Sequence, residues 1–123
     1  MNAKKTDDLR MLEIRRLILD TRRRIEALSL TEESVVRPST YVESILVDTL
    51  YMNVFRVLEE ASNLDFETQF ANPDIPWNSV RGMRNRFARD YGSVDPAIIW
   101  ETVKSGFPPL LGMAERYIAD RGL

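Results

Sequence analysis

The feature that most constrains the fold is a stripe of residues at helical spacing between Pro38 and Ser62. Its members recur at steps of three and four residues, and they are Val42, Ile45, Leu46, Thr49, Leu50, Asn53, Val54, Val57, Leu58 and Ala61. A stripe this broad is typical of a helix that buries one side in a core. We therefore expect a long helix here, with Asn53 as a hydrogen-bonded amide inside the core.

A second long segment, from Asp7 to Leu28, repeats this spacing. Its apolar residues are Met11, Ile14, Ile18, Ile25 and Leu28, and Thr21 fills the gap between them. The pattern predicts an amphipathic helix about 33 Å long. A seam of alternating three- and four-residue steps also suits pairing with a second copy of the chain.

The other face of this first segment is rich in arginine. It carries Arg10, Arg15, Arg16, Arg22, Arg23 and Arg24, alternating with Asp7, Asp8, Glu13, Asp20 and Glu26. Alternating signs on one helix favour a solvated, ion-paired face. The alternative interpretation is an extension of a nucleic-acid-binding surface.

Turn residues divide the chain between the second long segment and residue 77. The link 29–39 contains Thr31-Glu32-Glu33-Ser34, which suits one turn of helix. Residues 64–70 suit a short helix with Asp65 near its start, and Asn72-Pro73-Asp74 then predicts a turn. Pro76 fits the first turn of the next helix, because the amide that proline lacks would have no partner there.

The last third of the chain predicts two more helices. The first runs from Trp77 to Asp90, and Gly92 is expected to end it in the left-handed conformation. Asp95-Pro96 supplies an N-cap and a proline for the start of the second. Gly106-Phe107-Pro108-Pro109 must then break or kink that helix before the apolar residues that complete it.

These elements predict an all-α, up-and-down bundle of about four to five helices. The length of 123 residues predicts a single domain over residues 1–123. No apolar run approaches the roughly 18 residues of a membrane span, and the N-terminus lacks the apolar segment of a secretory signal. We therefore expect a cytoplasmic protein that makes no use of a membrane.

The composition excludes several kinds of chemistry. The chain has no cysteine and no histidine, which excludes disulfides, thiolate catalysis and the usual structural zinc sites. Asp65, Glu67 and Asp74 are the only carboxylate group near the basic run described next, and their spacing matches no oxygen-ligand loop. We predict no metal and no cofactor.

A basic run occupies the helix expected after Trp77. Arg81, Arg84, Arg86 and Arg89 fall within nine positions of a chain whose net charge is −2. Such a run is either a solvated face held by neighbouring carboxylates or a phosphate site, because planar guanidinium groups match phosphate oxygens well. Composition by itself favours the solvated face.

The wider pattern around this run resembles the HepT family. It reads Ile75-Pro76-Trp77-x-x-Val80-x-Gly82-Met83-Arg84-Asn85-x-Phe87-x-x-x-Tyr91, then Val94-Asp95-x-x-Ile98-Ile99-Trp100-x-x-Val103, then Phe107-Pro108-x-Leu110. Proteins of this family are small all-helical ribonuclease toxins of the HEPN superfamily, paired with a minimal nucleotidyltransferase (MNT) antitoxin. The resemblance implies a HEPN-like bundle and a homodimer whose motif helices line one basic cleft.

The family signature is Arg, four residues, His, one residue, Tyr. It places the arginine at Arg84, the polar residue after it at Asn85 and the tyrosine at Tyr91, but the histidine position holds Arg89. The resemblance implies RNA cleavage without metal, by attack of the substrate's own 2′-hydroxyl. Arg84 would neutralise the scissile phosphate, Asn85 would orient it, and Arg81, Arg86 and Arg89 would contact neighbouring phosphates.

Arginine at position 89 changes what can be expected. Arginine stays protonated at physiological pH, so Arg89 can hold a phosphate but cannot accept a proton as histidine does. Loss of a general base typically costs about 10²- to 10⁴-fold in rate. We expect an RNA-binding surface whose cleavage activity is impaired or lost. Three explanations stay open: a natural inactive member, a deliberately disabled version, or a member that uses another residue.

Tyr91 has two interpretations. An aromatic residue at a helix end usually packs its ring to anchor the turn. The resemblance implies instead that the partner nucleotidyltransferase transfers AMP to the Tyr91 hydroxyl. The added charge and bulk beside Arg84 would then exclude an RNA phosphate.

Helical geometry sets a condition on this motif. At about 100° per residue, Arg84 and Tyr91 lie within about 20° of each other, whereas residue 89 lies about 140° from Arg84. The three can converge only if the helix ends or tightens near residue 89. Two rival functions stay open: a non-catalytic helical module that docks a nucleotidyltransferase or nucleotide, and a purely structural bundle. A nuclease needs Arg84 of both subunits to face a shared cleft. Capping of Arg84 by the chain's own carboxylates would favour the docking module.

Overall fold

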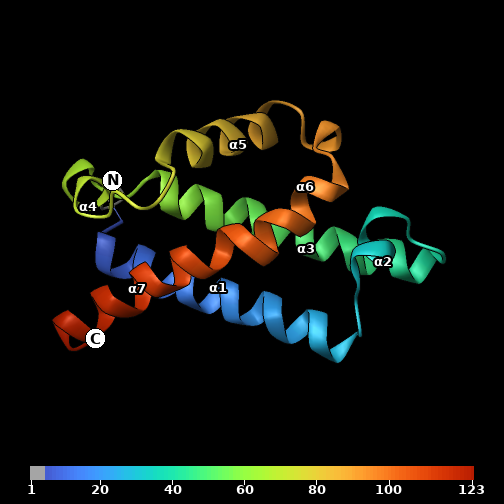
Figure 1. Cartoon of the computed structure of the whole chain (residues 1–123), viewed down its shortest axis with the longest axis horizontal. Helices are drawn as coiled ribbons and strands as arrows, with labels where there is room; N and C mark the ends of the chain where they lie inside the picture. Colours follow the sequence, from blue (N-terminus) through green and yellow to red (C-terminus); the bar gives the residue numbers. More distant parts are fainter. Residues whose placement is uncertain (1–4) are drawn as a thin grey trace.

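The computed structural model describes residues 5–123, and within this range every regular element is helical (Figure 1). The long elements are α1 (Asp7–Ala27), α3 (Tyr41–Ser62), α5 (Trp77–Arg89) and α7 (Phe107–Arg121). The short ones are α2 (Glu32–Val36), α4 (Phe66–Phe70) and α6 (Pro96–Glu101). This confirms the all-α bundle predicted from the sequence. None of the helices in the described range is long and apolar enough to cross a membrane.

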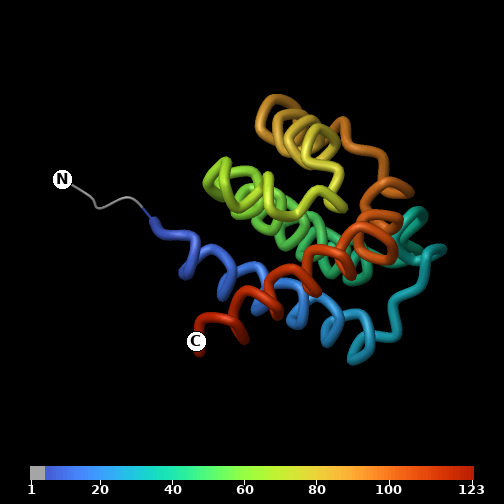
Figure 2. The backbone as a smooth tube through the Cα atoms, turned by 60° about the vertical axis from the view of Figure 1, so that its left-hand side comes forward, coloured from blue at the N-terminus to red at the C-terminus, as the bar shows by residue number. Residues whose placement is uncertain are grey.

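Helix α3 is the central element, with α1 along one side and α5 along the other (Figures 1 and 2). Helix α7 crosses α1 and closes the core between them. The largest fully buried side chains are Met11, Ile14, Leu17, Ile18, Val54, Val57, Ile99, Phe107 and Met113. Burial of apolar side chains from α1, α3 and α7 against one another is the main stabilising contribution to such a bundle.

Helix α1 matches its predicted extent, since its N-cap is Thr6 and its last residue is Ala27. The Thr6 side chain accepts from the Leu9 amide at 3.3 Å, which satisfies one free amide of the first turn. Two details of the predicted seam were wrong. Leu28 lies past the helix end and is exposed, and Leu17, which the seam omitted, is fully buried.

The stripe on α3 is buried over only part of its length. Val42 is 65% exposed and Ile45 is 48% exposed, so the prediction that they are buried was wrong. The first turns of α3 extend beyond α1 and α5, and the short helix α2 lies beside them (Figure 1). Asn53 is buried as predicted, and its amide nitrogen donates to Thr21 Oγ1 and Asp20 Oδ2, both at 3.1 Å.

The predicted short helix of the first link is present as α2, held by a capping box between Thr31 and Ser34. The prediction for residues 64–70 is confirmed as α4. Asp65 stands at its N-cap position without a side-chain capping bond, although its backbone amide donates to Asp7 on α1 at 3.1 Å.

The predicted break before Pro108 takes the form of a π-helical segment, Thr102–Gly106, between α6 and α7. Phe107 at its end donates its amide to the carbonyl of Thr102, five residues back. Pro108 and Pro109 follow in the first turn of α7, where proline is tolerated because few backbone carbonyls depend on the N–H groups that it lacks. The wider π-helical turn accommodates the two prolines while α6 and α7 stay continuous with each other.

Candidate functional site

The basic run lies on α5, which attaches to α3 through an aromatic cluster. Phe87 is buried, and its ring centroid lies 5.6 Å from that of Phe55, 6.4 Å from Tyr51 and 5.4 Å from Tyr91. Val80 is also buried, and Met83 is half-buried, as predicted. These contacts place the arginines of α5 on its outward face.

Helix α5 ends before Tyr91, but Arg89 still belongs to it and stays about 140° from Arg84 around the helix axis. Its last residue is Arg89, and Asp90 then leaves the helical conformation with φ −154° and ψ 78°. Tyr91 begins a short 3₁₀ turn, Tyr91–Ser93, so the direction of the chain changes between Arg89 and Tyr91. The predicted left-handed Gly92 was wrong, because Gly92 lies inside this turn and has no positive φ.

Arg84 is held by a carboxylate from α3. Its Nε donates to Glu59 Oε2 at 2.6 Å, and its Nη2 donates to Glu59 Oε1 at 3.2 Å. Its Nη1 donates to Asn85 Oδ1 at 3.2 Å. This bidentate pair fixes the plane of the guanidinium group while about a third of the Arg84 side chain (34%) stays exposed.

The pair perturbs both of its members. The hydrogen bond from Arg84 holds the pKa of Glu59 below its ordinary value, and the same bond raises the pKa of Arg84. Asn63 adds a donor to the site, since its Nδ2 lies 3.3 Å from Glu59 Oε1. Both charges of the pair therefore persist at neutral pH.

Glu59 was not predicted from the sequence as a partner of Arg84. The carboxylates expected near the basic run were Asp65, Glu67 and Asp74, but the one that forms an ion pair with Arg84 is Glu59. The available signal was the position of Glu59 next to the buried Leu58, in the last turns of a helix expected to pack. Within residues 5–123, no three acidic side chains gather closely enough to hold a metal ion.

Arg81 and Arg86 form hydrogen bonds to uncharged groups of neighbouring segments. Arg81 donates to Gln69 Oε1 of α4 at 2.8 Å and to Asn78 Oδ1 at 2.7 Å. Arg86 donates from Nη2 to the Ser93 carbonyl at 3.0 Å, across the turn that follows α5. Because amides and carbonyls carry no net charge, both guanidinium groups keep their positive charge uncompensated.

Arg89, at the end of α5, is exposed and makes no hydrogen bond or ion pair with the rest of the described chain. Arg81, Arg86 and Arg89 thus share α5 with Arg84 and form no ion pair with a carboxylate of residues 5–123. Such a set of charges attracts phosphate groups.

Tyr91 combines a packed ring with partial exposure to solvent. Its ring contacts Phe87 and Tyr51, whose centroids lie 5.4 and 5.9 Å away, yet the residue is 39% exposed. Partial burial, and then the negative charge of Asp48, raise the pKa of Tyr91. The hydroxyl is therefore protonated at neutral pH, and a reaction at this oxygen would need a base to remove its proton.

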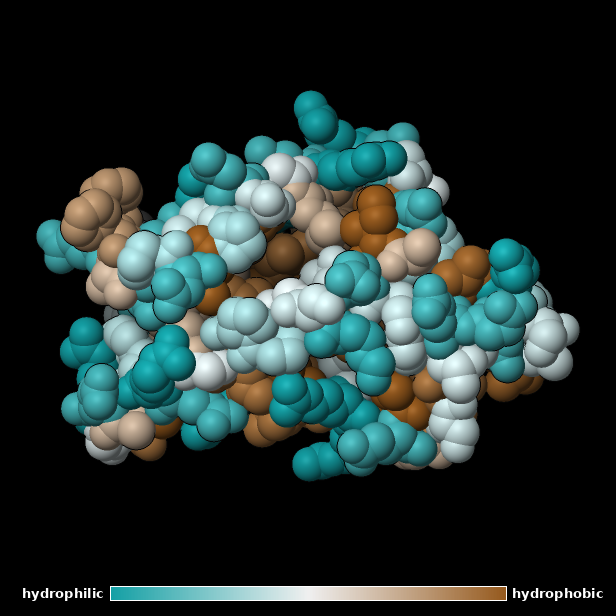
Figure 3. Space-filling model, in the orientation of Figure 1, coloured by the Kyte–Doolittle hydropathy of each residue, from teal (hydrophilic) through white to brown (hydrophobic). Residues whose placement is uncertain are grey.

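An apolar hollow lies on another side of α5, apart from the arginines. It has a volume of about 180 Å³ and opens between α5 and the start of α7, with Val80, Met83 and Leu110 among its lining residues (Figure 3). It carries no charged side chain, so it adds nothing to the chemistry at Arg84.

The chain was compared with known proteins. A family model described as ribonuclease HepT-like matches residues 18–117. A probable ribonuclease HepT of Thermococcus cleftensis is 33% identical over 95 residues, which cover 74% of this chain and 86% of that protein. A putative RNase of Caldanaerobacter subterraneus is 28% identical over 71 residues, covering 57% of this chain and 63% of that protein. A putative RNase of Methanocaldococcus jannaschii is 26% identical over 73 residues, covering 57% and 65%. No solved structure gives a significant match.

Proposed function

This chain belongs to the HepT-like ribonuclease family. We propose that it is the toxin of a toxin–antitoxin pair, and that it binds RNA through the arginines of α5. The observation that carries the proposal is α5 itself, on which Arg84 is oriented by two bonds to Glu59 and three further arginines have no carboxylate partner within residues 5–123. A fixed guanidinium on a helix with uncompensated positive charge suits the phosphate of an RNA strand.

The roles of the individual residues follow from their positions. Arg84 contacts the scissile phosphate and opposes the negative charge that develops on it when the 2′-hydroxyl attacks. Asn85 accepts from Arg84 through Oδ1, which leaves its Nδ2 free to donate to a phosphate oxygen. Arg81, Arg86 and Arg89 hold the flanking phosphates. None of these steps uses a metal ion.

The missing element is a proton acceptor. Arg89 stands at the signature position of a histidine, and the chain holds no histidine. The 2′-hydroxyl must lose its proton as it attacks, and a protonated guanidinium cannot take it. We therefore propose that the chain as it stands cleaves RNA weakly or not at all.

Tyr91 is the proposed control point. Tyr91 is 39% exposed just after the end of α5, and a partner nucleotidyltransferase that transfers AMP to its hydroxyl would add a phosphate next to the basic run. That phosphate would compete with RNA for the same guanidinium groups. The active unit would be a homodimer in the cytoplasm, in which two α5 helices face one RNA strand.

A second candidate function is a non-catalytic module that docks a nucleotidyltransferase or a nucleotide. It is favoured by one observation, the capping of Arg84 by Glu59 of the same chain. In this case Glu59 occupies the site that RNA would need, and Arg84 serves to join α3 to α5.

The deciding experiment compares three proteins on a mixed RNA pool without added metal and with EDTA present. They are the chain as it stands, Arg89→His, and Arg84→Ala combined with Arg89→His. We expect only Arg89→His to cut, leaving 2′,3′-cyclic phosphate ends. Cleavage by the unchanged chain at the same rate would refute the argument about the missing base. If none of the three cuts, the docking module becomes the better description.

A further inference from the structure

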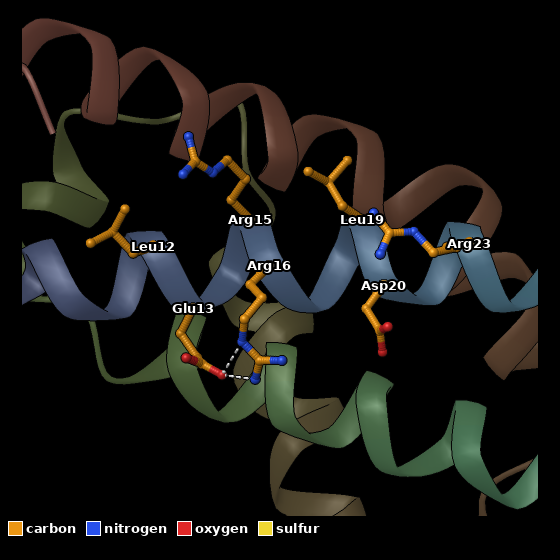
Figure 4. A pocket seen from close by; sticks show the side chains of 7 residues that line it. All are labelled: Leu12, Glu13, Arg15, Arg16, Leu19, Asp20 and Arg23. Atoms are coloured by element: carbon orange, nitrogen blue, oxygen red, sulfur yellow. Dashed lines mark hydrogen bonds and ion pairs between the residues drawn. The ribbon is translucent and has the colours of Figure 1, made fainter.

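The outer face of α1 carries a second group of arginines, far from the motif. A shallow hollow of about 590 Å³ runs along this helix, with α7 on one side and α3 on the other (Figure 4). Leu12, Arg15 and Leu19 point towards α7, whereas Glu13 and Arg16 point towards α3 (Figure 4). The hollow thus has aliphatic side chains along it and guanidinium groups beside them.

The two acidic side chains that line the hollow are already engaged. Glu13 accepts from Arg16 and, at 3.3 Å, from Arg56 of α3. Asp20 pairs with Arg24 at 2.8 Å and also accepts from Asn53 at 3.1 Å. The predicted ion-paired face therefore exists, but only for some of the arginines.

Three arginines of α1 have no such partner. Arg15, Arg22 and Arg23 make no hydrogen bond or ion pair with any of residues 5–123, and the last two are exposed. They are spread over two turns, about 12 Å along the helix axis. A chain with a net charge of −2 thus places a local excess of positive charge on one exposed helix.

This surface is separate from the motif, because α3 lies between α1 and α5 (Figure 1). It fits a flexible polyanion better than a compact anion: its charges form a row, and Leu19, which is 40% exposed, offers apolar contact between them. Single-stranded RNA has this chemistry, with a phosphate at every nucleotide and apolar sugar and base surfaces between.

We propose that Arg15, Arg22 and Arg23 form a second RNA-binding surface, which holds the part of a long RNA that extends beyond α5. The proposal rests on the proposed function, since it takes RNA as the ligand. A short RNA that occupies α5 by itself does not reach α1, so the surface contributes affinity only for long strands.

The test measures fluorescence anisotropy of two labelled, unstructured RNAs, one of about thirty nucleotides and one of about eight. The variant carries Arg15→Gln, Arg22→Gln and Arg23→Gln together. Its matched control carries Arg37→Gln, Lys104→Gln and Arg116→Gln, which remove the same charge from other faces. Glutamine keeps the helix propensity of α1, and circular dichroism checks that both proteins fold.

For the long RNA we expect the α1 variant to bind about tenfold more weakly, with a salt dependence smaller by about 2 in its logarithmic slope, since three phosphate contacts are lost. The short RNA should bind equally to all three proteins. An equal loss in the control variant would overturn the proposal, because general charge would then explain the affinity. Unchanged binding of the long RNA by the α1 variant would also overturn it.

Two further outcomes separate this proposal from the proposed function. If Arg84→Ala abolishes RNA binding and the α1 variant does not affect it, the α1 surface fails and the proposed function stands. If only the α1 variant loses RNA, the role of α5 fails instead. Tighter binding of poly-L-glutamate than of the long RNA, lost in the α1 variant, would assign the surface to an acidic protein and refute RNA as its ligand.

Discussion

The two arginine-rich helices differ in what holds their guanidinium groups. On α5, Arg81 and Arg84 are bonded to side chains of other helices, Gln69 and Glu59, at 2.6 to 2.8 Å. On α1, Arg22 and Arg23 extend from the helix without a partner among the described residues. A guanidinium held by several bonds has one orientation and can act on one phosphate, whereas a free one contributes charge. The number of arginines therefore does not separate a positioned site from a diffuse surface, but their partners do.

The largest effect is expected from removing the aromatic contacts that attach α5 to α3. Replacing the buried Phe87 by alanine should lower the free energy of unfolding by about 3–5 kcal/mol, because it leaves a cavity among Tyr51, Phe55 and Tyr91. Urea denaturation measures the change. Leu19→Ala on the outer face of α1 is the comparison, and it should cost less than about 1 kcal/mol, since Leu19 is partly exposed. Similar losses in the two variants would show that the cluster does not anchor α5.

A second prediction tests whether position matters more than charge. In an Arg89→His background, Arg84→Ala should reduce cleavage of a short RNA about 10²- to 10³-fold, as expected for a lost transition-state contact. Arg23→Ala in the same background removes the same charge from α1 and should leave that rate unchanged. Single-turnover kinetics give both numbers. If the two substitutions lower the rate equally, α5 has no special role.

Glu59→Gln tests the Arg84–Glu59 pair through the pH dependence of stability. The hydrogen bond from Arg84 lowers the pKa of Glu59 from its ordinary value of 4.5. A carboxyl group whose folded pKa is lowered stabilises the fold above its unfolded pKa, and this contribution is lost as pH falls through the folded pKa. At neutral pH the wild-type protein should therefore have a higher free energy of unfolding than the Glu59→Gln variant. This difference in free energy should vanish as pH falls below about 4.5.

The size of this effect is limited, because about a third of each side chain of the pair is exposed. We expect a difference below about 1 kcal/mol at neutral pH, measured by denaturation across the pH range. Asp74→Asn is a suitable control, since Asp74 is exposed and forms no ion pair within residues 5–123. A difference that stays constant down to acid pH would contradict the assigned role of the Arg84 bond.

The smallest effect concerns a single arginine of α1. Arg22→Gln should weaken binding of a long RNA by about two- to threefold and reduce the logarithmic salt slope by about 0.7, the value for one phosphate contact on a single strand. The free energy of unfolding should stay within about 0.5 kcal/mol of wild type, because an exposed side chain without partners is removed. Titrations at several salt concentrations give the slope, and an unchanged slope would argue against a phosphate contact at Arg22.

Much of the fold could be predicted from local signals. Thr31 and Asp95 cap α2 and α6, as their residue types favour, and Pro96 follows Asp95 at the first helical position. Helix α5 ends close to the position that the motif geometry pointed to, although Arg89 is still part of the helix. These features depend on a few consecutive residues, and capping and helical spacing act over that range.

Contacts between distant segments escaped prediction. The carboxylate partner of Arg84 comes from 25 positions earlier in the chain, and the partner of Arg81 from 12 positions earlier. Val42 and Ile45 continue the α3 stripe without being buried, because burial depends on how far the neighbouring helices extend. Periodicity shows which residues share a helix face, but it does not show what covers that face.

The sequence by itself determined the helices, most of their ends, and the run of arginines on α5. It also determined that a proton acceptor of the histidine type is missing, since this depends on residue identity alone. The tertiary structure decided which arginines are held and which are free. The physical reason is that an ion pair needs two side chains within about 4 Å, and the packing of α3 against both α1 and α5 sets those distances.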